Sequence, residues 1–176
     1  LKLKIPKLYF SGKFKDLDLD LINANKVFIL KPRYGHSSNN VFLMNKGTNL
    51  FDNKDYNIKD FKKIFDKNED IIIEEYVKNF NYNNENEYVI NDDFKIYTFK
   101  GTPELILHKF YIDGEYYCNY YDGECNKLNI KIRKNLIVKD KFVKKQHLQK
   151  IINHAKYIGS KVFNQVFVRL DFYLNN

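Results

Sequence analysis

The sequence predicts an α+β fold built from two small antiparallel sheets, each backed by helices. Three observations predict it. Short apolar runs at residues 27–30 and 41–44 stand on either side of a polar loop, which is typical of neighbouring strands. Gly101-Thr102-Pro103 separates two further strand-like segments and indicates a β-hairpin. Residues 145–160 carry apolar side chains at helical spacing, with lysines and histidines on the other face, and predict an amphipathic helix.

The composition is that of a folded chain of modest size. Hydrophobic residues make up 44% of the 176 residues and include 15 Phe and 14 Tyr, a composition that favours a folded chain with an aromatic core over a disordered tail. The length suits one domain or two small lobes. No apolar stretch approaches the roughly 20 residues of a membrane span, and no signal-peptide pattern opens the chain. We therefore expect a cytoplasmic protein without a membrane span.

The net charge and the cysteine spacing indicate which ligands and partners to expect. The net charge of +8 could recruit phosphate, nucleic acid or anionic lipid, but the lysines are scattered and form no run. No nucleic acid is therefore expected as a partner, although a basic module that stacks bases on Tyr and Phe stays an alternative. Cys118 and Cys125 fit no common zinc or redox spacing and are interpreted as reduced, structural thiols.

The apolar pattern also predicts the other elements along the chain. Residues 1–25 form an opening segment with a short strand or turn at the alternating residues 17–21. Gly159 suits the C-terminal end of the long helix. The remaining predictions are, in chain order, a short helix at 60–65, a buried strand at 71–77, a polar loop at 78–91, hairpin strands at 94–99 and 104–110, a strand at 116–121 and a long strand at 166–174.

Lys31 is the first residue of the first candidate site. It lies at the end of a buried strand, and a polar loop follows it. Gly35, Ser37 and Ser38 lie in that loop, where backbone amides can form an anion nest and hydroxyls add donors. The lysine would add a point charge. No Gly-Lys-Ser/Thr follows, so this is not a Walker loop, and a solvated turn is the plain alternative.

Two further candidates lie where strands meet loops. Glu74, Glu75 and Val77 close the predicted strand 71–77, and in extended backbone the Glu75 carbonyl and the Val77 amide point the same way, toward a ligand such as adenine. A plain sheet terminus is the alternative. Asp93 begins another strand on the same face as Lys95 and could accept hydrogen bonds from ribose hydroxyls. A surface ion pair explains that pattern equally well.

The last candidate is the pair Arg169 and Asp171, which share one face of a predicted strand whose other face is apolar. Two opposite charges on a half-buried strand need each other or a ligand. Arginine can neutralise a phosphate, and aspartate can hold Mg²⁺, a hard ion that bridges carboxylates to phosphates. A solvent-facing salt bridge is the alternative.

Taken together and in this order, these motifs resemble the ATP-grasp superfamily. The later segments and the opening Ile5-Pro6-Lys7-Leu8-Tyr9 are most similar to its teichuronopeptide-biosynthesis (TupA-like) branch. The segments that carry the resemblance are Phe28-Ile29-Leu30-Lys31-Pro32 with Ser37-Ser38, Ile73-Glu74-Glu75-Tyr76-Val77, Asp93-Phe94-Lys95 with Phe99-Lys100-Gly101-Thr102-Pro103, and Val168-Arg169-Leu170-Asp171-Phe172-Tyr173.

The resemblance implies an ATP-grasp fold whose two lobes grip a nucleotide, with ATP and Mg²⁺ as cofactors. The roles it implies are phosphate contact for Lys31, a closing loop at Ser37 and Ser38, adenine binding by Glu74, Glu75 and Val77, ribose binding by Asp93, contact with the transferred phosphate for Arg169, and a Mg²⁺ ligand in Asp171. The loop has Asn39 and Asn40 where the family often has glycines.

The resemblance covers residues 1–176 as one incomplete ATP-grasp domain, with a first lobe at about 26–77 and a second at about 78–176. It implies a ligase that joins a carboxylate to an amine through an acyl phosphate, with glycan-linked substrates from cell-surface assembly. A non-catalytic nucleotide- or glycan-binding module is the alternative. We expect a piece of a longer protein, inactive by itself, because the resemblance puts the remaining metal ligands beyond Asn176.

Overall fold

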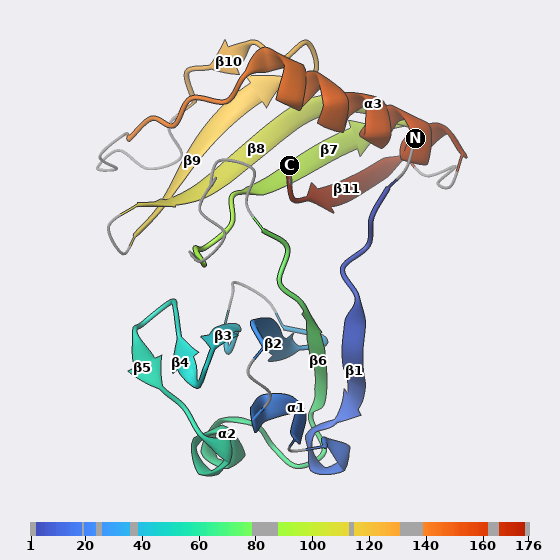
Figure 1. The fold of residues 1–176 in the computed structure, drawn as a ribbon. Helices are drawn as coiled ribbons and strands as arrows, with labels where there is room; N and C mark the ends of the chain where they lie inside the picture. The colour runs from blue at the N-terminus through green and yellow to red at the C-terminus, as the bar shows by residue number, and fades with distance from the viewer. Residues whose placement is uncertain are drawn as a thin grey trace. The chain divides into compact units, whose positions relative to one another are not determined.

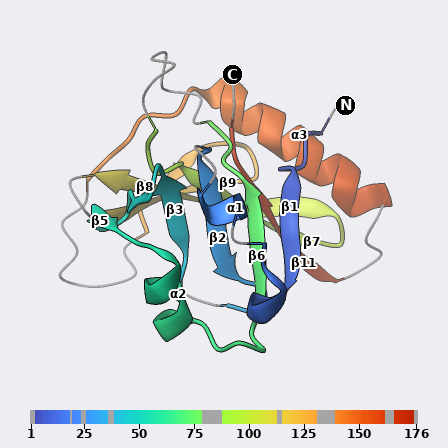
Figure 2. The same cartoon turned by 60° about the horizontal axis from the view of Figure 1, so that its bottom comes forward.

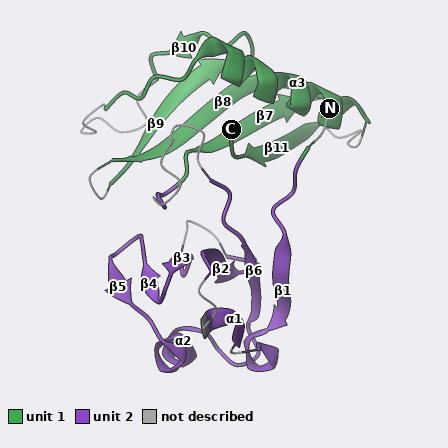
Figure 3. Ribbon diagram, viewed as in Figure 1, with its two compact units in different colours: residues 1–3, 79–83, 91–176 green, residues 4–78, 84–90 purple. Residues whose placement is uncertain are grey.

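The computed structural model describes residues 3–18, 20–23, 26–35, 39–78, 88–112, 115–130, 139–161 and 166–174. The chain divides into two compact units (Figure 3). In chain order, the unit called here the first comprises residues 4–78 and 84–90, drawn in purple as unit 2 in Figure 3. The unit called here the second comprises residues 1–3, 79–83 and 91–176, drawn in green as unit 1. Each unit contains one antiparallel sheet, of six strands in the first and five in the second, so the predicted α+β class with two antiparallel sheets is confirmed.

The first unit is built on a sheet with the strand order β1-β6-β2-β3-β4-β5. Figure 2 shows β1, β6, β2 and β3 side by side. Its strands are β1 (Leu8–Lys13), β2 (Phe28–Pro32), β3 (Phe42–Asn45), β4 (Thr48–Asn49), β5 (Lys54–Asp55) and β6 (Asp70–Glu75). Its helices are a 3-10 turn (Phe14–Asp16), α1 (Asp20–Asn23) and α2 (Ile58–Ile64). The opening segment thus contributes β1, which pairs with β6.

The core of the first unit lies on one face of this sheet. Leu30, Ile71 and Ile73 are fully buried there and pack with Phe61 of α2. Because side chains alternate along a strand, Lys31 of β2 and Glu74 of β6 lie on the opposite face. A capping box starts α2 two residues earlier than predicted, since the Asn57 side chain accepts from Lys59 N and Asp60 accepts from Asn57 N.

The second unit has the strand order β10-β9-β8-β7-β11, and the long helix α3 covers one face of the sheet (Figure 1). The elements are β7 (Asp93–Phe99), β8 (Thr102–Ile112), β9 (Glu115–Asp122), β10 (Lys127–Leu128), α3 (Lys145–Lys161) and β11 (Phe167–Phe172). The face away from α3 carries charged side chains and is called here the polar face, defined by Asp93, Lys95, Lys109, Arg169 and Asp171.

Most predicted elements are present, and the differences have local causes. A short strand or turn was predicted at 17–21, and the described residues 17, 18, 20 and 21 contain no strand; the Asp18 side chain accepts from Asp20 N at 3.0 Å, at the start of α1. The strand β6 ends at Glu75, two residues before its predicted end at Val77. Cys118 and Cys125 are free thiols, as predicted. Within the described residues, no helix is long and apolar enough to cross a membrane.

Gly159 lies in the last turn of α3, near the predicted end of the helix, but it does not terminate the helix, which continues to Lys161. The glycine serves close packing instead. A Cβ on Gly159 would lie 2.8 Å from the Cα of Gly101, which turns the β7–β8 hairpin with φ +78°. Helix and hairpin therefore meet backbone to backbone, and only glycine permits that approach.

We expect Gly159→Ala to lower the free energy of unfolding by about 1–3 kcal/mol, the usual cost of overpacking. Helix propensity alone predicts a gain of about 1 kcal/mol, so the sign is diagnostic. Urea denaturation measures the change, and Lys156→Ala on the exposed side of α3 is the matched control. A stabilised Gly159→Ala variant would contradict the packing.

Candidate functional site

The structure brings together two of the predicted site residues in the first unit. Lys31 Nζ donates to Glu74 Oε1 at 2.5 Å, although the residues are 43 positions apart in the chain. The side chains are 31% and 19% exposed, so the ion pair is partly screened from water. A half-buried lysine needs a counter-charge, and Glu74 supplies it here. A bound phosphate could replace Glu74 as the counter-charge of Lys31.

The other residues predicted around adenine lie at the end of β6. The exposed carboxylate of Glu75 accepts from Lys7 N at 3.0 Å, and Glu75 N donates to Lys7 O at 2.8 Å. Glu75 therefore fastens the opening segment to the sheet. Val77 follows the strand, and between them Tyr76 is buried and donates its hydroxyl to Val89 O at 2.8 Å. Tyr76 thus anchors residues 88–90 beside this strand end.

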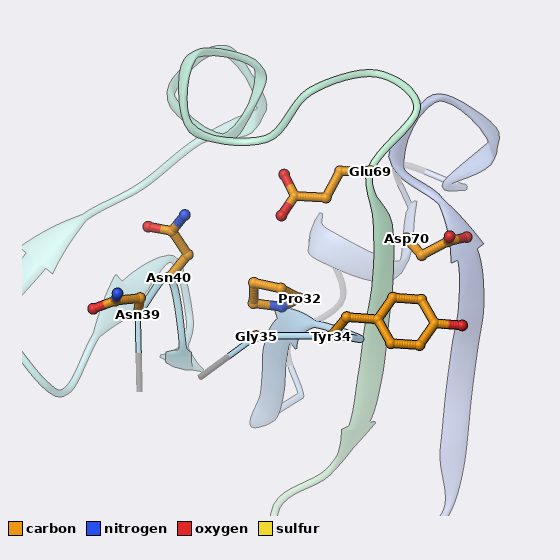
Figure 4. Close-up of a pocket in the computed structure, with 7 residues that line it drawn as sticks. All are labelled: Pro32, Tyr34, Gly35, Asn39, Asn40, Glu69 and Asp70. Carbon is orange, nitrogen blue, oxygen red and sulfur yellow. The ribbon is translucent and has the colours of Figure 1, made fainter. Parts of the chain in front are cut away.

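The predicted phosphate loop is only partly visible. Ser37 and Ser38 lie outside the described residues. The ends of the loop border a pocket whose carboxylates come from the start of β6 (Figure 4). The lining residues are Pro32, Tyr34, Gly35, Asn39, Asn40, Glu69 and Asp70. Two carboxylates oppose the binding of a phosphate, so this pocket itself does not fit the predicted anion nest.

The remaining predicted site residues lie together on the polar face of the second unit. Arg169 holds Asp171 through two hydrogen bonds, Nε to Oδ1 at 2.8 Å and Nη2 to Oδ2 at 3.1 Å. These bonds raise the pKa of the arginine. Lys95 lies opposite Asp171 in the pairing of β7 with β11 and donates to Asp171 Oδ2 at 3.2 Å. Lys95 also forms an ion pair with Asp93.

Lys95 is thus the centre of this cluster. The sequence predicted it as a neighbour of Asp93 on one strand face and as part of the motif Asp93-Phe94-Lys95, but not as a site residue. The bond to Asp171 spans 76 positions and depends on β7 pairing with β11, which no local pattern indicates. Lysine bridges two carboxylates in the same way that a bound cation would.

A buried network supports the start of β7 from the α3 side. Asp92, which is 2% exposed, accepts from Lys141 Nζ at 2.6 Å and lies 2.9 Å from His108 Nε2. The His108 ring stacks on Phe94 with 4.4 Å between centroids. Burial raises the pKa of Asp92, but the hydrogen bonds from His108 and Lys141 outweigh it and lower the pKa overall. Asp92 therefore fixes the backbone that positions its neighbour Asp93.

The chemistry of the polar face fits Mg²⁺ in part. Asp171 is a carboxylate whose side chain is 41% exposed, and Asp93 shares Lys95 with it. Within the described ranges, no group of three or more His, Cys, Asp or Glu residues is placed to hold a metal ion. Mg²⁺ is commonly held by one or two carboxylates together with substrate phosphates and water, so Asp171 suits it when a nucleotide is present.

Comparison with known proteins identifies the class to which these sheets and charged clusters belong. The whole chain, residues 1–176, matches the family model described as TupA-like ATP-grasp. The chain therefore belongs to the TupA-like ATP-grasp family, as its motifs predicted. A search among curated proteins found no match.

The chain is also similar to two crystal structures of D-alanine–D-alanine ligase from Bacillus anthracis. In one, the identity is 17% and the TM-score 0.48, and the alignment covers 97% of this chain and 47% of the ligase. In the other, which is complexed with ATP, the identity is 15% and the TM-score 0.46, with 97% and 46% covered. This chain thus spans about half the length of these ligases.

Proposed function

We propose that the protein is an ATP- and Mg²⁺-dependent ligase that joins a carboxylate to an amine, in the assembly of cell-surface glycan or glycopeptide. The observation that carries the proposal is the cluster on the polar face, where Asp171 holds Arg169 and Lys95. Membership in the ATP-grasp family supports it. A cluster of cations around one exposed carboxylate is suited to a polyphosphate with its metal ion.

Each predicted site residue that the structure describes takes a role in this proposal. In the first unit, Lys31 exchanges its ion pair with Glu74 for a contact with phosphate. The released Glu74 side chain and the backbone of Glu75 and Val77 then bind adenine. In the second unit, Asp93 takes the ribose hydroxyls and Arg169 neutralises the transferred phosphoryl group. The charged side chains of the polar face are held in position before the substrates bind. Such preorganised charge stabilises the transition state and is the main contribution to catalysis of phosphoryl transfer.

The proposed reaction has two steps. An oxygen of the substrate carboxylate attacks the γ-phosphorus of ATP, and ADP leaves, which gives an acyl phosphate. The amine then attacks the acyl carbon, inorganic phosphate leaves, and the amine nitrogen loses a proton to give the amide. The first step exchanges a poor leaving group for phosphate. Mg²⁺ bound at Asp171 would supply positive charge to the phosphates.

Trapping with hydroxylamine tests this chemistry. The protein is incubated with Mg-ATP, hydroxylamine and a panel of amino acids and uronic acids, and hydroxamate and ADP are measured. A ligase of this kind gives both products in equal amounts with at least one carboxylate. ADP without hydroxamate across the panel would contradict an acyl phosphate.

The second candidate is a non-catalytic nucleotide- or glycan-binding module of the same fold. It is favoured by one observation, since both oxygens of Asp171 are already held by Arg169 and Lys95. Such a module would bind Mg-ATP or a glycan and give neither ADP nor hydroxamate. Binding measurements beside the trapping assay therefore separate the two candidates.

Replacing Lys31 tests the first unit's part in the proposal. We expect Lys31→Met to weaken Mg-ATP binding about 10- to 100-fold, because a hydrogen bond to a charged group contributes about 1.5–3 kcal/mol. Calorimetric titration measures the dissociation constant. The matched control is Lys13→Met, since Lys13 lies in the same sheet and pairs with Asp70 at 3.7 Å. Equal effects of the two variants would show that general charge, not Lys31, governs binding.

A further inference from the structure

Lys109 occupies a central position on the polar face, outside the motifs that suggested the function. It lies on β8, directly opposite Asp93 of β7 on one side and Cys118 of β9 on the other. Its side chain is partly buried, and its ammonium lies 3.8 Å from the centre of the Tyr116 ring. The ring covers one side of the charge through a cation–π contact.

Lys109 differs from the other two cations of the polar face in its partners. Lys95 is paired with Asp93 and Asp171, and Arg169 is paired with Asp171. Among the described residues, no carboxylate lies within ion-pair distance of the Lys109 ammonium. The three cations thus face two carboxylates, and those two carboxylates are already engaged.

The nearer neighbours of Lys109 do not supply the missing negative charge. Burial raises the pKa of Tyr116 to about 12, so its hydroxyl is neutral at pH 7. Burial also raises the pKa of the Cys118 thiol, which stays protonated. Burial lowers the pKa of Lys109 itself, and the negative charge of Asp93 on the neighbouring strand offsets this only in part, which reflects the cost of an ammonium that is partly removed from water. An incoming anion would recover that cost.

We propose that Lys109 is a binding residue for a substrate oxyanion on the polar face, beside Asp93 and Lys95. The inference rests on the ligase function proposed above, which brings two kinds of oxyanion to this face: the phosphates of the nucleotide and the carboxylate that is activated. The Tyr116 ring covers one side of the Lys109 ammonium, and the ligand would approach from another side. Because Lys109 forms no ion pair with an acidic side chain of the described residues, it can bind an anion without first breaking such a pair.

Titrations with two probes test the proposal. The first probe is Mg-ATP, and the second is phosphonoacetate in the presence of Mg-ADP, because this stable compound carries a carboxylate next to a phosphonate. The variants are Lys109→Gln, which removes the charge, and Lys109→Arg, which keeps it. Lys150→Gln, on the exposed side of α3, is the control for a lost charge. Thermal unfolding of each variant shows that it is folded.

We expect Lys109→Gln to raise the dissociation constant of at least one probe tenfold or more, and Lys109→Arg to stay within threefold of the wild type. An effect confined to Mg-ATP assigns the lysine to the nucleotide phosphates, and an effect confined to phosphonoacetate assigns it to the carboxylate. If Lys109→Gln binds both probes within twofold of the wild type, the inference is overturned. A folded wild type that binds neither probe would instead overturn the proposed function, and the inference with it.

Discussion

Replacing Asp92 by alanine is expected to lower the free energy of unfolding by about 3–5 kcal/mol, the cost of breaking a buried charge pair by removing one partner. His108 and Lys141 both bond to this carboxylate, and His108 is fully buried between aromatic rings. Without Asp92, the Lys141 ammonium loses its counter-charge and the buried Nε2 of His108 loses its hydrogen-bond partner. Denaturation in urea measures the loss. Glu104→Ala, an exposed carboxylate on β8, is the control and should change stability by about 0.5 kcal/mol or less.

The pH dependence of the free energy of unfolding tests the contribution of the Asp92 carboxylate in a second way. The folded-state pKa of Asp92 lies below its ordinary value of 3.8, so its stabilising contribution is fully present above that pH. It is lost as the pH falls through the lower, folded-state value. The difference in stability between the wild type and Asp92→Asn should therefore shrink as the pH falls below about 4. A difference that stays constant from neutral pH to pH 2 would show that the negative charge of Asp92 does not contribute to stability.

Changing Asp171 to asparagine is expected to have opposite effects on ATP binding with and without magnesium. In the wild type, Arg169 and Lys95 are both engaged by Asp171. The neutral amide releases them, so ATP without metal should bind more tightly to Asp171→Asn than to the wild type. The gain in affinity that Mg²⁺ brings should disappear, because its carboxylate ligand is lost. Phosphoryl transfer should fall by about 10²- to 10³-fold.

Calorimetric titration of ATP with excess EDTA and with MgCl₂ separates these effects. Glu104→Gln removes a carboxylate from the same unit and is the matched control, with no change expected in either condition. A variant that binds Mg-ATP and metal-free ATP as the wild type does would show that Asp171 takes no part in the metal site.

Much of the fold could be predicted because its main elements have strong local patterns. The spacing of Leu148, Ile151, Ile152 and Ala155 indicated α3, and these residues are buried against the sheet. The strands β4, β5 and β10 have two residues each, too few to show any period, and were missed. The close contact between Gly159 and Gly101 was also beyond prediction, because it depends on how the helix crosses a distant hairpin.

The candidate site could be predicted where its residues are neighbours in one strand. Arg169 and Asp171 stand two positions apart, so their shared face follows from the strand itself, and the structure pairs them. The partnership of Lys31 with Glu74 and that of Lys95 with Asp171 depend on strand register across 43 and 76 positions. Register between distant strands is set by the whole core, and the sequence of one strand does not reveal it.

Thermal unfolding with and without Mg-ATP tests most directly whether the protein binds a nucleotide. A ligand at about 100 times its dissociation constant stabilises a folded protein by roughly 2.7 kcal/mol, so the wild type should unfold at a clearly higher temperature in Mg-ATP. Lys31→Met should lose most of this shift, and Lys13→Met should keep it. A well-folded wild type whose unfolding temperature does not change in millimolar Mg-ATP would contradict nucleotide binding, and with it the proposed ligase.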